Sequence, residues 1–332
     1  MDDMTLSDRF HAAFDVAPPA GGFERLRREL SSYRPDRRGR PAFHMRWNKM
    51  TLRLTAAAAV VIVAVALITA YFAAQRPGTS YVPAASDKTY RSINESDHQA
   101  LIETYNSTDC LNFTDPSCAA AIATTQGAAE RWLADLQANP APDHFQVIDH
   151  QLRMHLTATI ADLTIASAAI TSGSKDVFNA VLDYASGHEA PWFDRMAGAI
   201  VYSKTVSGVD FKQVMAAQKL SLESCSLCGE LGTSTFTDCN TPTNVCPMEV
   251  SAVSDQIAVV LESAVQFAAP SEFSTQASRL ELDLANADTA LLNLEIAILS
   301  GAPVENTGLR SNLSAYHVAF AAIEADITSI LG

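Results

Sequence analysis

The hydrophobic pattern contains one uninterrupted apolar run, which separates two regions of different character. Residues 54–74, LTAAAAVVIVAVALITAYFAA, contain no charged side chain. At about 1.5 Å of rise per residue, a helix of this length spans the roughly 30 Å hydrocarbon core of a bilayer. Elsewhere apolar residues recur every three or four positions, which is typical of amphipathic helices. The sequence therefore predicts an all-α protein with a single transmembrane helix.

The distribution of charge predicts how this helix is oriented. Residues 1–53 carry 11 Lys and Arg against 7 Asp and Glu, whereas residues 75–332 carry 12 against 30. Basic residues next to a span resist translocation, so we expect a cytoplasmic N-terminus and an extracytoplasmic C-terminal domain at the plasma membrane. Cleavage as a signal peptide is disfavoured, because the apolar run is long and Tyr71-Phe72-Ala73-Ala74 is a poor cleavage site. We therefore expect an uncleaved signal-anchor.

Residues 1–53 are expected to form a basic cytoplasmic tail with two short amphipathic helices. A piece this small cannot build its own core, so its apolar side chains are candidates for binding a partner protein through residues 5–31. These candidates follow helical spacing on either side of a Pro-Pro-Ala-Gly-Gly break: Leu6, Phe10, Phe14, Phe23, Leu26 and Leu30. The basic segment 34–53 suits contact with the lipid bilayer. Nucleic-acid binding is disfavoured, because no recognisable nucleic-acid-binding fold accompanies this segment.

An internal repeat organises the outer part of the chain. After a linker at residues 75–92, cysteine, proline, phenylalanine and glycine residues recur at one ungapped offset of 128 residues. The matched pairs are Cys118 and Cys246, Leu133 and Leu261, Pro142 and Pro270, Phe145 and Phe273, Leu152 and Leu280, Leu156 and Leu284, Leu163 and Leu291, and Gly173 and Gly301. This pattern predicts two tandem, related helix bundles of about four helices each, at residues 93–207 and 208–332.

Each copy is expected to contain a helix of roughly 20 residues, a proline turn and a longer helix. The longer helix of the first copy would end at Gly173 and carry an apolar stripe at three- and four-residue steps: Phe145, Ile148, Leu152, Leu156, Leu163, Ala166 and Ile170. The second copy has Phe273, Leu280, Leu284, Leu291, Leu294 and Ile298 in matching places. A further helical stretch, near residues 176–203, should be broken by Pro191.

The six cysteines all lie beyond the apolar run, which in an exported domain predicts disulfides. Short loops and the repeat favour three pairs: Cys110 with Cys118, Cys225 with Cys228, and Cys239 with Cys246. One alternative is a redox-active Cys225-x2-Cys228 pair, although no thioredoxin-like setting is visible. Another is a zinc site formed by the last four cysteines, which the first copy could not reproduce. Neither alternative is favoured, and we expect no metal or cofactor.

The histidines and acidic residues of the first long helix do not form an obvious catalytic site. His150 and His155 are five positions apart, which turns the two rings away from each other, and His144 completes the group. We therefore interpret these histidines as solvated or capping residues, and Asp143, Asp149 and Asp162 as one polar helix face. No G-x-S-x-G, phosphate loop, H-E-x-x-H or EF-hand loop occurs. The pattern identifies no catalytic residue.

Three classes of function fit this layout. The first is a single-pass signalling or regulatory protein, whose outer domain senses an unknown extracytoplasmic ligand and whose tail binds a cytoplasmic partner. In architecture alone it resembles membrane-anchored regulators such as anti-sigma factors, without the His/Cys zinc pattern of some of them. The second is an envelope-anchored binding or structural protein with no signalling role. The third, and least favoured, is an anchored hydrolase or redox enzyme.

Overall fold

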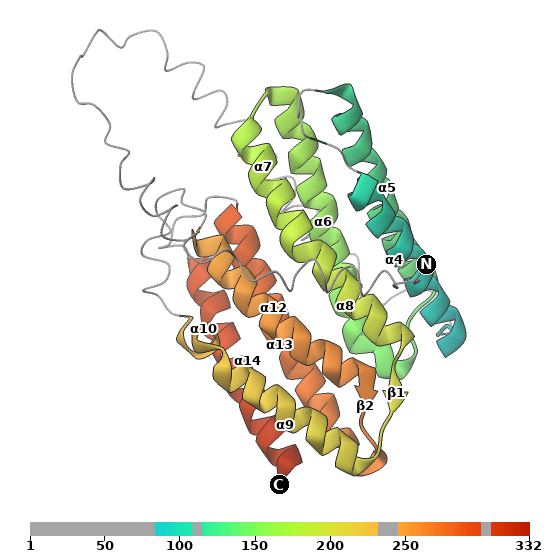
Figure 1. The fold of residues 1–332 in the computed structure, drawn as a ribbon, viewed down its shortest axis with the longest axis vertical. Coiled ribbons are helices and arrows are strands. Elements are labelled where there is room, and N and C mark those ends of the chain that lie inside the picture. Colours follow the sequence, from blue (N-terminus) through green and yellow to red (C-terminus); the bar gives the residue numbers. More distant parts are fainter. Residues whose placement is uncertain (1–83, 108–109, 111–114, 232–244, 300–306) are drawn as a thin grey trace, which may run out of the picture. The chain divides into compact units, whose positions relative to one another are not determined.

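The computed structural model describes residues 84–107, 110, 115–231, 245–299 and 307–332. These residues are mostly helical (Figure 1), as the periodicity predicts. The predicted transmembrane helix, the cytoplasmic tail with its six partner-binding candidates, and residues 75–83 of the predicted linker lie outside this part of the chain.

The first half of the described chain consists of antiparallel helices in sequence order. They are α4 (Asp87–Ser107), α5 (Pro116–Ala138), η1 (Asp143–Phe145), α6 (Gln146–Ser172), α7 (Lys175–Tyr184), η2 (Ala185–Glu189) and α8 (Ala190–Val201). Helix α5 packs against α4 and α6, α6 packs against α7, and α8 returns to α4. This order places α6, α7 and α8 on the side that faces the second half (Figure 1).

The second half repeats this kind of packing. Its elements are β1 (Lys204–Thr205), α9 (Gly208–Ser224), α10 (Ser226–Glu230), α12 (Val245–Gln266), β2 (Phe267–Ala268), η4 (Ser271–Phe273), α13 (Ser274–Leu299) and α14 (Thr307–Leu331). Helix α13 packs against α12 and α14, and α9 contacts both α12 and α14. The two short strands pair in parallel, and β1 follows directly after the first half in the chain. Along their length the halves meet through α6 with α13 and α8 with α12.

Local sequence signals explain several helix ends. The Asp115 carboxylate accepts a hydrogen bond from the backbone N–H of Ser117 at 2.9 Å, and Pro116 occupies the first helical turn of α5. Both features are typical of helix N-termini. Helix α6 ends at Gly173, whose φ of 70° lies in the left-handed region. Glycine reaches this conformation without steric cost, which explains why α6 stops there.

Helix bounds also follow the repeat offset. The short helices η1 and η4 each come directly after a proline, Pro142 and Pro270, and their bounds differ by the same 128 residues as those prolines. Helices α5 and α12 end at positions with the same separation. One large hydrophobic core runs through both halves, and it includes Trp132, Phe193, Ile257, Leu284 and Tyr316.

The apolar stripe predicted for α6 is buried, from Phe145 to Ala166, with Ile170 partly buried. In α13 the matching leucines are buried, whereas Phe273 is half-buried. Two details differ from expectation. Helix α4 begins at Asp87, inside the stretch assigned to the linker, because Tyr90 is fully buried and donates a hydrogen bond to Asp149 at 3.0 Å. Pro191 does not break the helical stretch, because the π-helical segment η2 precedes it and Pro191 starts α8.

Among the described helices, the one over Asp143–Ser172 is long and apolar enough to cross a membrane by length and composition alone. Half of its apolar window is buried inside the protein. It also carries buried ionised side chains that pair with neighbouring helices, as shown below. These contacts are those of a core helix, so this helix adds no argument for membrane insertion.

Disulfides join Cys110 to Cys118 and Cys225 to Cys228. These are two of the three pairs that the loop lengths predict. Cys239 lies outside the described residues, as does the side chain of Cys246. Because both sulfurs of the Cys225–Cys228 pair are bonded to each other, neither is a thiolate available to zinc. Each of the two bridges closes a short loop next to the start of a helix, α5 in one case and α10 in the other.

Candidate functional site

Three polar residues of α6 that the sequence pattern places on a solvated face are buried. Asp149, His155 and Asp162 are at most 7% exposed, so that prediction is wrong. The physical reason is that α6 is covered on several sides, by α5, α7 and α13, and not only along its apolar stripe. His144, His150 and Asp143 are exposed, in agreement with the prediction.

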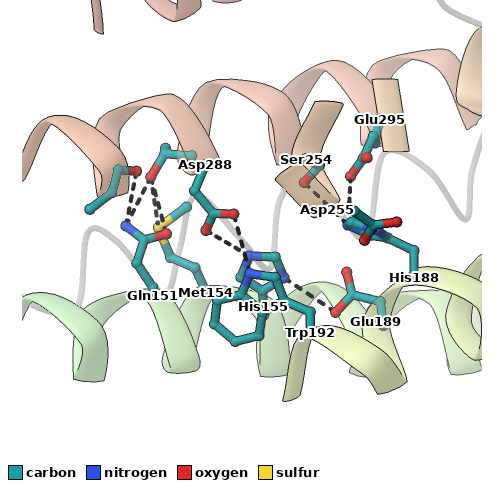
Figure 2. Close-up of polar contacts among 12 residues, drawn as sticks. Gln151, Met154, His155, His188, Glu189, Trp192, Ser254, Asp255, Asp288 and Glu295 are labelled. Carbon is teal, nitrogen blue, oxygen red and sulfur yellow. Dashed lines mark hydrogen bonds and ion pairs between the residues drawn. The ribbon is translucent and has the colours of Figure 1, made fainter. Parts of the chain in front are cut away.

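His155 is held between two carboxylates from different parts of the chain (Figure 2). Its Nδ1 lies 3.3 Å from Glu189 Oε2, and its Nε2 lies 2.9 Å from Asp288 Oδ2. All three side chains are fully buried. The Trp192 ring stacks on the imidazole at 3.6 Å between centroids, and its Nε1 donates to Asp288 Oδ1 at 3.2 Å. His155 therefore links α6, η2 and α13.

His188, the residue before Glu189, makes a second link between the halves. Its Nδ1 lies 3.0 Å from Asp255 Oδ1, and its Nε2 lies 3.6 Å from Glu295 Oε2 and 3.3 Å from Ser254 Oγ (Figure 2). The side chain of His188 is 3% exposed, whereas that of Asp255 is 46% exposed. We call His155, His188, Glu189, Asp288 and Glu295 the histidine–carboxylate cluster.

Tyr184 bridges two carboxylates of the cluster. Its hydroxyl lies 2.6 Å from Glu295 Oε2 and 3.3 Å from Glu189 Oε1. Thr159 donates to Glu189 Oε2 at 3.1 Å. Asp162 lies one helical turn further along α6, and its Oδ2 is buried without a hydrogen-bond partner among the described residues. The carboxyl groups of the cluster are thus coupled through hydroxyl groups as well as through the histidines.

Burial and charge together set the protonation of the two histidines. Burial disfavours the charged form, but the adjacent carboxylates outweigh it. The carboxylates of Asp288 and Glu189 hold the pKa of His155 at about 10. Glu295, Asp255 and Glu189 raise the pKa of His188 to about 9, again against burial. Both imidazoles are therefore positively charged at neutral pH.

The carboxyl groups divide into two kinds. For Asp162, burial first and then the charges of Glu189 and Glu295 raise the pKa well above its ordinary value. Burial also raises the pKa of Glu295, although His188 offsets part of the effect. For Glu189, burial is the largest single effect and raises the pKa, but the charges of His155 and His188 and the hydrogen bonds from His155 and Thr159 together outweigh it, so that the pKa is lowered. Glu189 is thus ionised, whereas Asp162 holds its proton to higher pH.

The π-helical segment η2 positions His188 and Glu189, two adjacent residues that contact different partners. A π-helical turn bonds i to i+5 and is rare in proteins. Here it spans Ala185–Glu189 and places the buried side chains of His188 and Glu189 among α6, α12 and α13. Pro191 lies in the first turn of α8, directly after this π-helical segment. As a result, the adjacent residues His188 and Glu189 contact different partners. His188 pairs with Asp255 and Glu295, and Glu189 pairs with His155.

A neutral hydrogen-bond network continues the contact between α6 and α13 beyond the cluster. The Gln151 amide donates to the backbone carbonyl of Ala285 at 3.2 Å and to Thr289 Oγ1 at 3.1 Å. Gln151 is buried and lies beside Met154 (Figure 2), whose Sδ is 3.8 Å from Thr289 Oγ1. Since buried polar groups are costly unless they are bonded, these pairs fix the register of the two helices.

Ser254, His188 and Asp255 have the hydrogen-bond order of a nucleophilic triad, with the imidazole between the hydroxyl and the carboxylate. Two properties prevent them from acting as one in this conformation. Ser254 is fully buried, so a substrate cannot reach its hydroxyl. His188 has a pKa of about 9, so it is charged at neutral pH and cannot accept the serine proton.

Within the described ranges, no group of three or more His, Cys, Asp or Glu side chains has an arrangement that could hold a metal ion. The described pocket of about 210 Å³ lies elsewhere, between α9 and α14, and is lined by Leu222, Ile327 and mixed charged residues. Neither observation suggests a cofactor. The chemistry that the cluster can perform by itself is the binding and release of protons.

Comparison of the chain with protein-family models, with curated proteins and with solved structures finds no match. Function must therefore be inferred from the geometry of the site and the layout of the chain.

Sequence patterns missed most of this cluster. Glu189, Asp288 and Glu295 were not singled out, because their partners are far away in the chain and a lone acidic residue on a helix is usually solvated. One signal was present in α6. His155, Thr159 and Asp162 follow i, i+4, i+7 spacing, which places them on one helix face. A polar stripe on a helix that also has a long apolar stripe indicates a second buried face.

Proposed function

We propose that this protein is a single-pass membrane signalling or regulatory protein. In this proposal residues 54–74 anchor the chain in the plasma membrane, the helical domain beyond them receives an extracytoplasmic input, and residues 5–31 bind a cytoplasmic partner. The observation that carries the proposal is the histidine–carboxylate cluster at the contact between the two halves. A buried ionic interface has alternative states that a small chemical change can select.

We also propose that the outer domain consists of two related four-helix bundles. The first would contain α4, α5, α6 and the continuous α7–η2–α8 stretch, and the second α9, α12, α13 and α14. Support comes from the offset that relates η1 to η4 and α5 to α12, and from helix contacts that connect four helices within each half. The two halves share a hydrophobic core and also meet through buried ion pairs, and a change in those ion pairs can shift packed helices relative to one another, which a signalling domain requires.

Coupling between the outer domain and the tail can be tested without knowing the input. Full-length protein in lipid nanodiscs is digested with trypsin, and cleavage within the basic segment 34–53 is followed over time. Three forms are compared: the natural protein, the His155→Gln variant, and His155→Gln with a short bismaleimide cross-link between cysteines replacing Arg195 and Glu262. Those two residues face each other across the halves at 3.1 Å and are partly exposed.

If the outer domain signals to the tail, His155→Gln should change tail cleavage severalfold and the cross-link should restore the natural rate. Equal cleavage in all three forms would contradict signalling and favour the alternative of an envelope-anchored binding protein with a passive tail. The cross-linked natural sequence is the matched control, because it carries the same modification with an intact cluster.

The tail partner requires a separate measurement. The tail is used as bait in cell extract, and the protein that it retains is compared with that retained by the Phe10→Ala, Phe14→Ala and Leu26→Ala variant. Loss of one specific protein from the variant would identify the partner. If the two baits retain the same proteins, these apolar residues have no recognition role.

A further inference from the structure

We propose that the histidine–carboxylate cluster is a proton-binding site that holds the two halves of the outer domain together while it is protonated and releases them as the surrounding pH rises. This inference rests on the proposed function, since it identifies the input of the same domain. It follows from the hydrogen-bond geometry of three groups, considered in turn.

The first group is His155, whose two ring nitrogens both face carboxylate oxygens. A neutral imidazole has one N–H donor and one acceptor nitrogen, whereas an imidazolium has two donors. With Glu189 on one side and Asp288 on the other, both contacts are satisfied only when one proton is bound, either as an imidazolium between two carboxylates or on one of the two acids. The geometry therefore requires a bound proton at the point where the two halves meet.

The second group is Tyr184, whose hydroxyl lies within hydrogen-bond distance of both Glu295 and Glu189. One hydroxyl hydrogen cannot point at two ionised carboxylates at once, so this arrangement favours a proton on one of the two acids. Glu189 already accepts from Thr159 and faces His155, which assigns the proton to Glu295. Glu295 can then donate to the Tyr184 oxygen while Tyr184 donates to Glu189. This chain again crosses from the first half to the second.

The third group is Asp162, which is buried beside the same carboxyls and has an oxygen with no partner in the described part of the chain. An ionised carboxylate in that position would be uncompensated, because the nearest charges are the acids Glu189 and Glu295. A neutral acid carries a much smaller desolvation cost. Asp162 therefore adds a third proton that must leave before the cluster can become fully ionised.

The groups that surround these protons come from every neighbouring element. In the first half these groups are Tyr105 (α4), His155 and Asp162 (α6), Tyr184 (α7), His188 and Glu189 (η2), and the uncharged ring of Trp192 (α8). In the second half they are Asp255 (α12), and Asp288 and Glu295 (α13). The ion pairs of the described Arg and Lys side chains go to other carboxylates. The two histidines thus carry the positive charge, and losing their protons leaves buried carboxylates facing one another.

The direction of the pH response follows from linkage. His155, with a pKa of about 10 against 6.5 when unfolded, contributes stability that is complete below 6.5 and is lost as pH rises through its folded pKa. The raised pKa values of Asp162 and Glu295 act with the same sign. The lowered pKa of Glu189 acts oppositely, and its contribution is lost only below its ordinary value of 4.5. The closed arrangement should therefore be most stable near pH 4.5 and should weaken as pH rises, first through Asp162 and Glu295 and above pH 6.5 also through His155.

The test measures the distance between the halves as a function of pH. Spin labels carried by noncanonical amino acids at the exposed positions Glu130 in α5 and Ser314 in α14 avoid the disulfide cysteines. In nanodiscs the full-length protein should give one narrow distance distribution at pH 6, and a longer or broader one as pH rises toward 10. An unchanged distribution from pH 6 to 10 would overturn the proposal.

Three variants show whether the cluster is responsible. His155→Gln should already give the open distribution at pH 6, and His144→Gln, at an exposed histidine, should behave as the natural protein. Asp162→Asn resembles the protonated acid, so it should remain closed at pH 6 and move the opening midpoint to higher pH by about one unit. Such an increase in the pH of the opening midpoint cannot result from misfolding, because a misfolded variant would not remain closed to higher pH. If Asp162→Asn leaves the midpoint unchanged, the proton assignment is wrong.

Failure of this inference and failure of the proposed function are distinguishable. Opening with pH but without any change in tail cleavage would support the proton site and contradict signalling to the tail. Tail cleavage that responds to the Arg195–Glu262 cross-link without any opening with pH would support signalling and overturn the proton site.

Discussion

Helices α6 and α13, which align at the repeat offset, bury matching apolar positions and differ in their buried polar ones. The matching leucines are Leu152 and Leu280, Leu156 and Leu284, and Leu163 and Leu291, all fully buried. The polar residues do not match: His155 aligns with Asp283, Asp162 with Ala290, Asp288 with Ile160, and Glu295 with Ser167. The repeated residues provide the packing within each half, whereas the unrepeated ones provide the contact between halves.

This difference gives the two halves unequal charges at their contact, which disfavours the pairing of like halves. The histidines come from the first half, and Asp255, Asp288 and Glu295 come from the second. Pairing two first halves would leave charged imidazoles facing each other, and pairing two second halves would bring carboxylates together. Buried like charges are strongly unfavourable, so the unrepeated residues specify the partner as well as the register.

The largest expected effect comes from removing a charge at the position where the halves differ most. His155→Gln leaves Glu189 and Asp288 buried without their cation, which should lower the free energy of unfolding by about 3–5 kcal/mol. Asp283→Asn, at the aligned position in α13, should change it by less than about 0.5 kcal/mol. Denaturant unfolding of the full chain in detergent, followed by circular dichroism, measures both.

A paired replacement separates loss of the ionic contact from loss of packing. The variant with both His155→Leu and Asp288→Leu should be less destabilised than the two single changes added together, by about 1–3 kcal/mol. Simple additivity would mean that the two side chains stabilise the fold independently, contrary to the interface described above.

The disulfides should have a smaller effect, which also compares one half with the other. The Cys110–Cys118 bridge encloses a sequence separation of 8 and the Cys225–Cys228 bridge a separation of 3. Replacing either pair with serines should cost about 2–3 kcal/mol, with the larger loss for the longer loop. The free energy of unfolding, measured with and without reductant, tests this prediction. An equal loss in the two serine variants would argue against loop entropy as the cause.

The smallest expected effect concerns the exposed edge of the contact between the halves. Arg195 and Glu262 pair at 3.1 Å with side chains 40% and 30% exposed. Exposed ion pairs contribute little, so Arg195→Gln should cost no more than about 1 kcal/mol and the loss should shrink in high salt. A loss as large as that of His155→Gln would show that the edge, and not the buried cluster, holds the halves together.

The sequence predicted the helices well because their ends have local causes. The proline turns at Pro142 and Pro270, the glycine that ends α6 and the leucine spacing along both long helices act within a few residues of where they lie. Helix α6 ends at Ser172, next to the predicted end at Gly173. The two disulfides described here were also predictable, since each joins cysteines that are close in the chain.

The cluster was not predictable in the same way, because its residues become informative only when their partners are known. His188 and Glu295 are more than a hundred residues apart, and each looks like an ordinary solvated residue in its own helix. A helical period identifies one buried face, but α6 has two. The π-helical segment could not be read from composition either, since Ala185–Glu189 contains nothing that distinguishes it from an α-helical turn.

That π-helical segment has a consequence for how such a contact can arise. An α-helix turns through about 100° per residue, and a π-helical turn accommodates one residue more than an α-helical one. A residue inserted into an α-helix at this place can therefore be accommodated within Ala185–Glu189, so that α7 and α8 remain one continuous helical stretch. A helical half could gain an ionic contact through such a change in length, while the packing of α7 and α8 was kept.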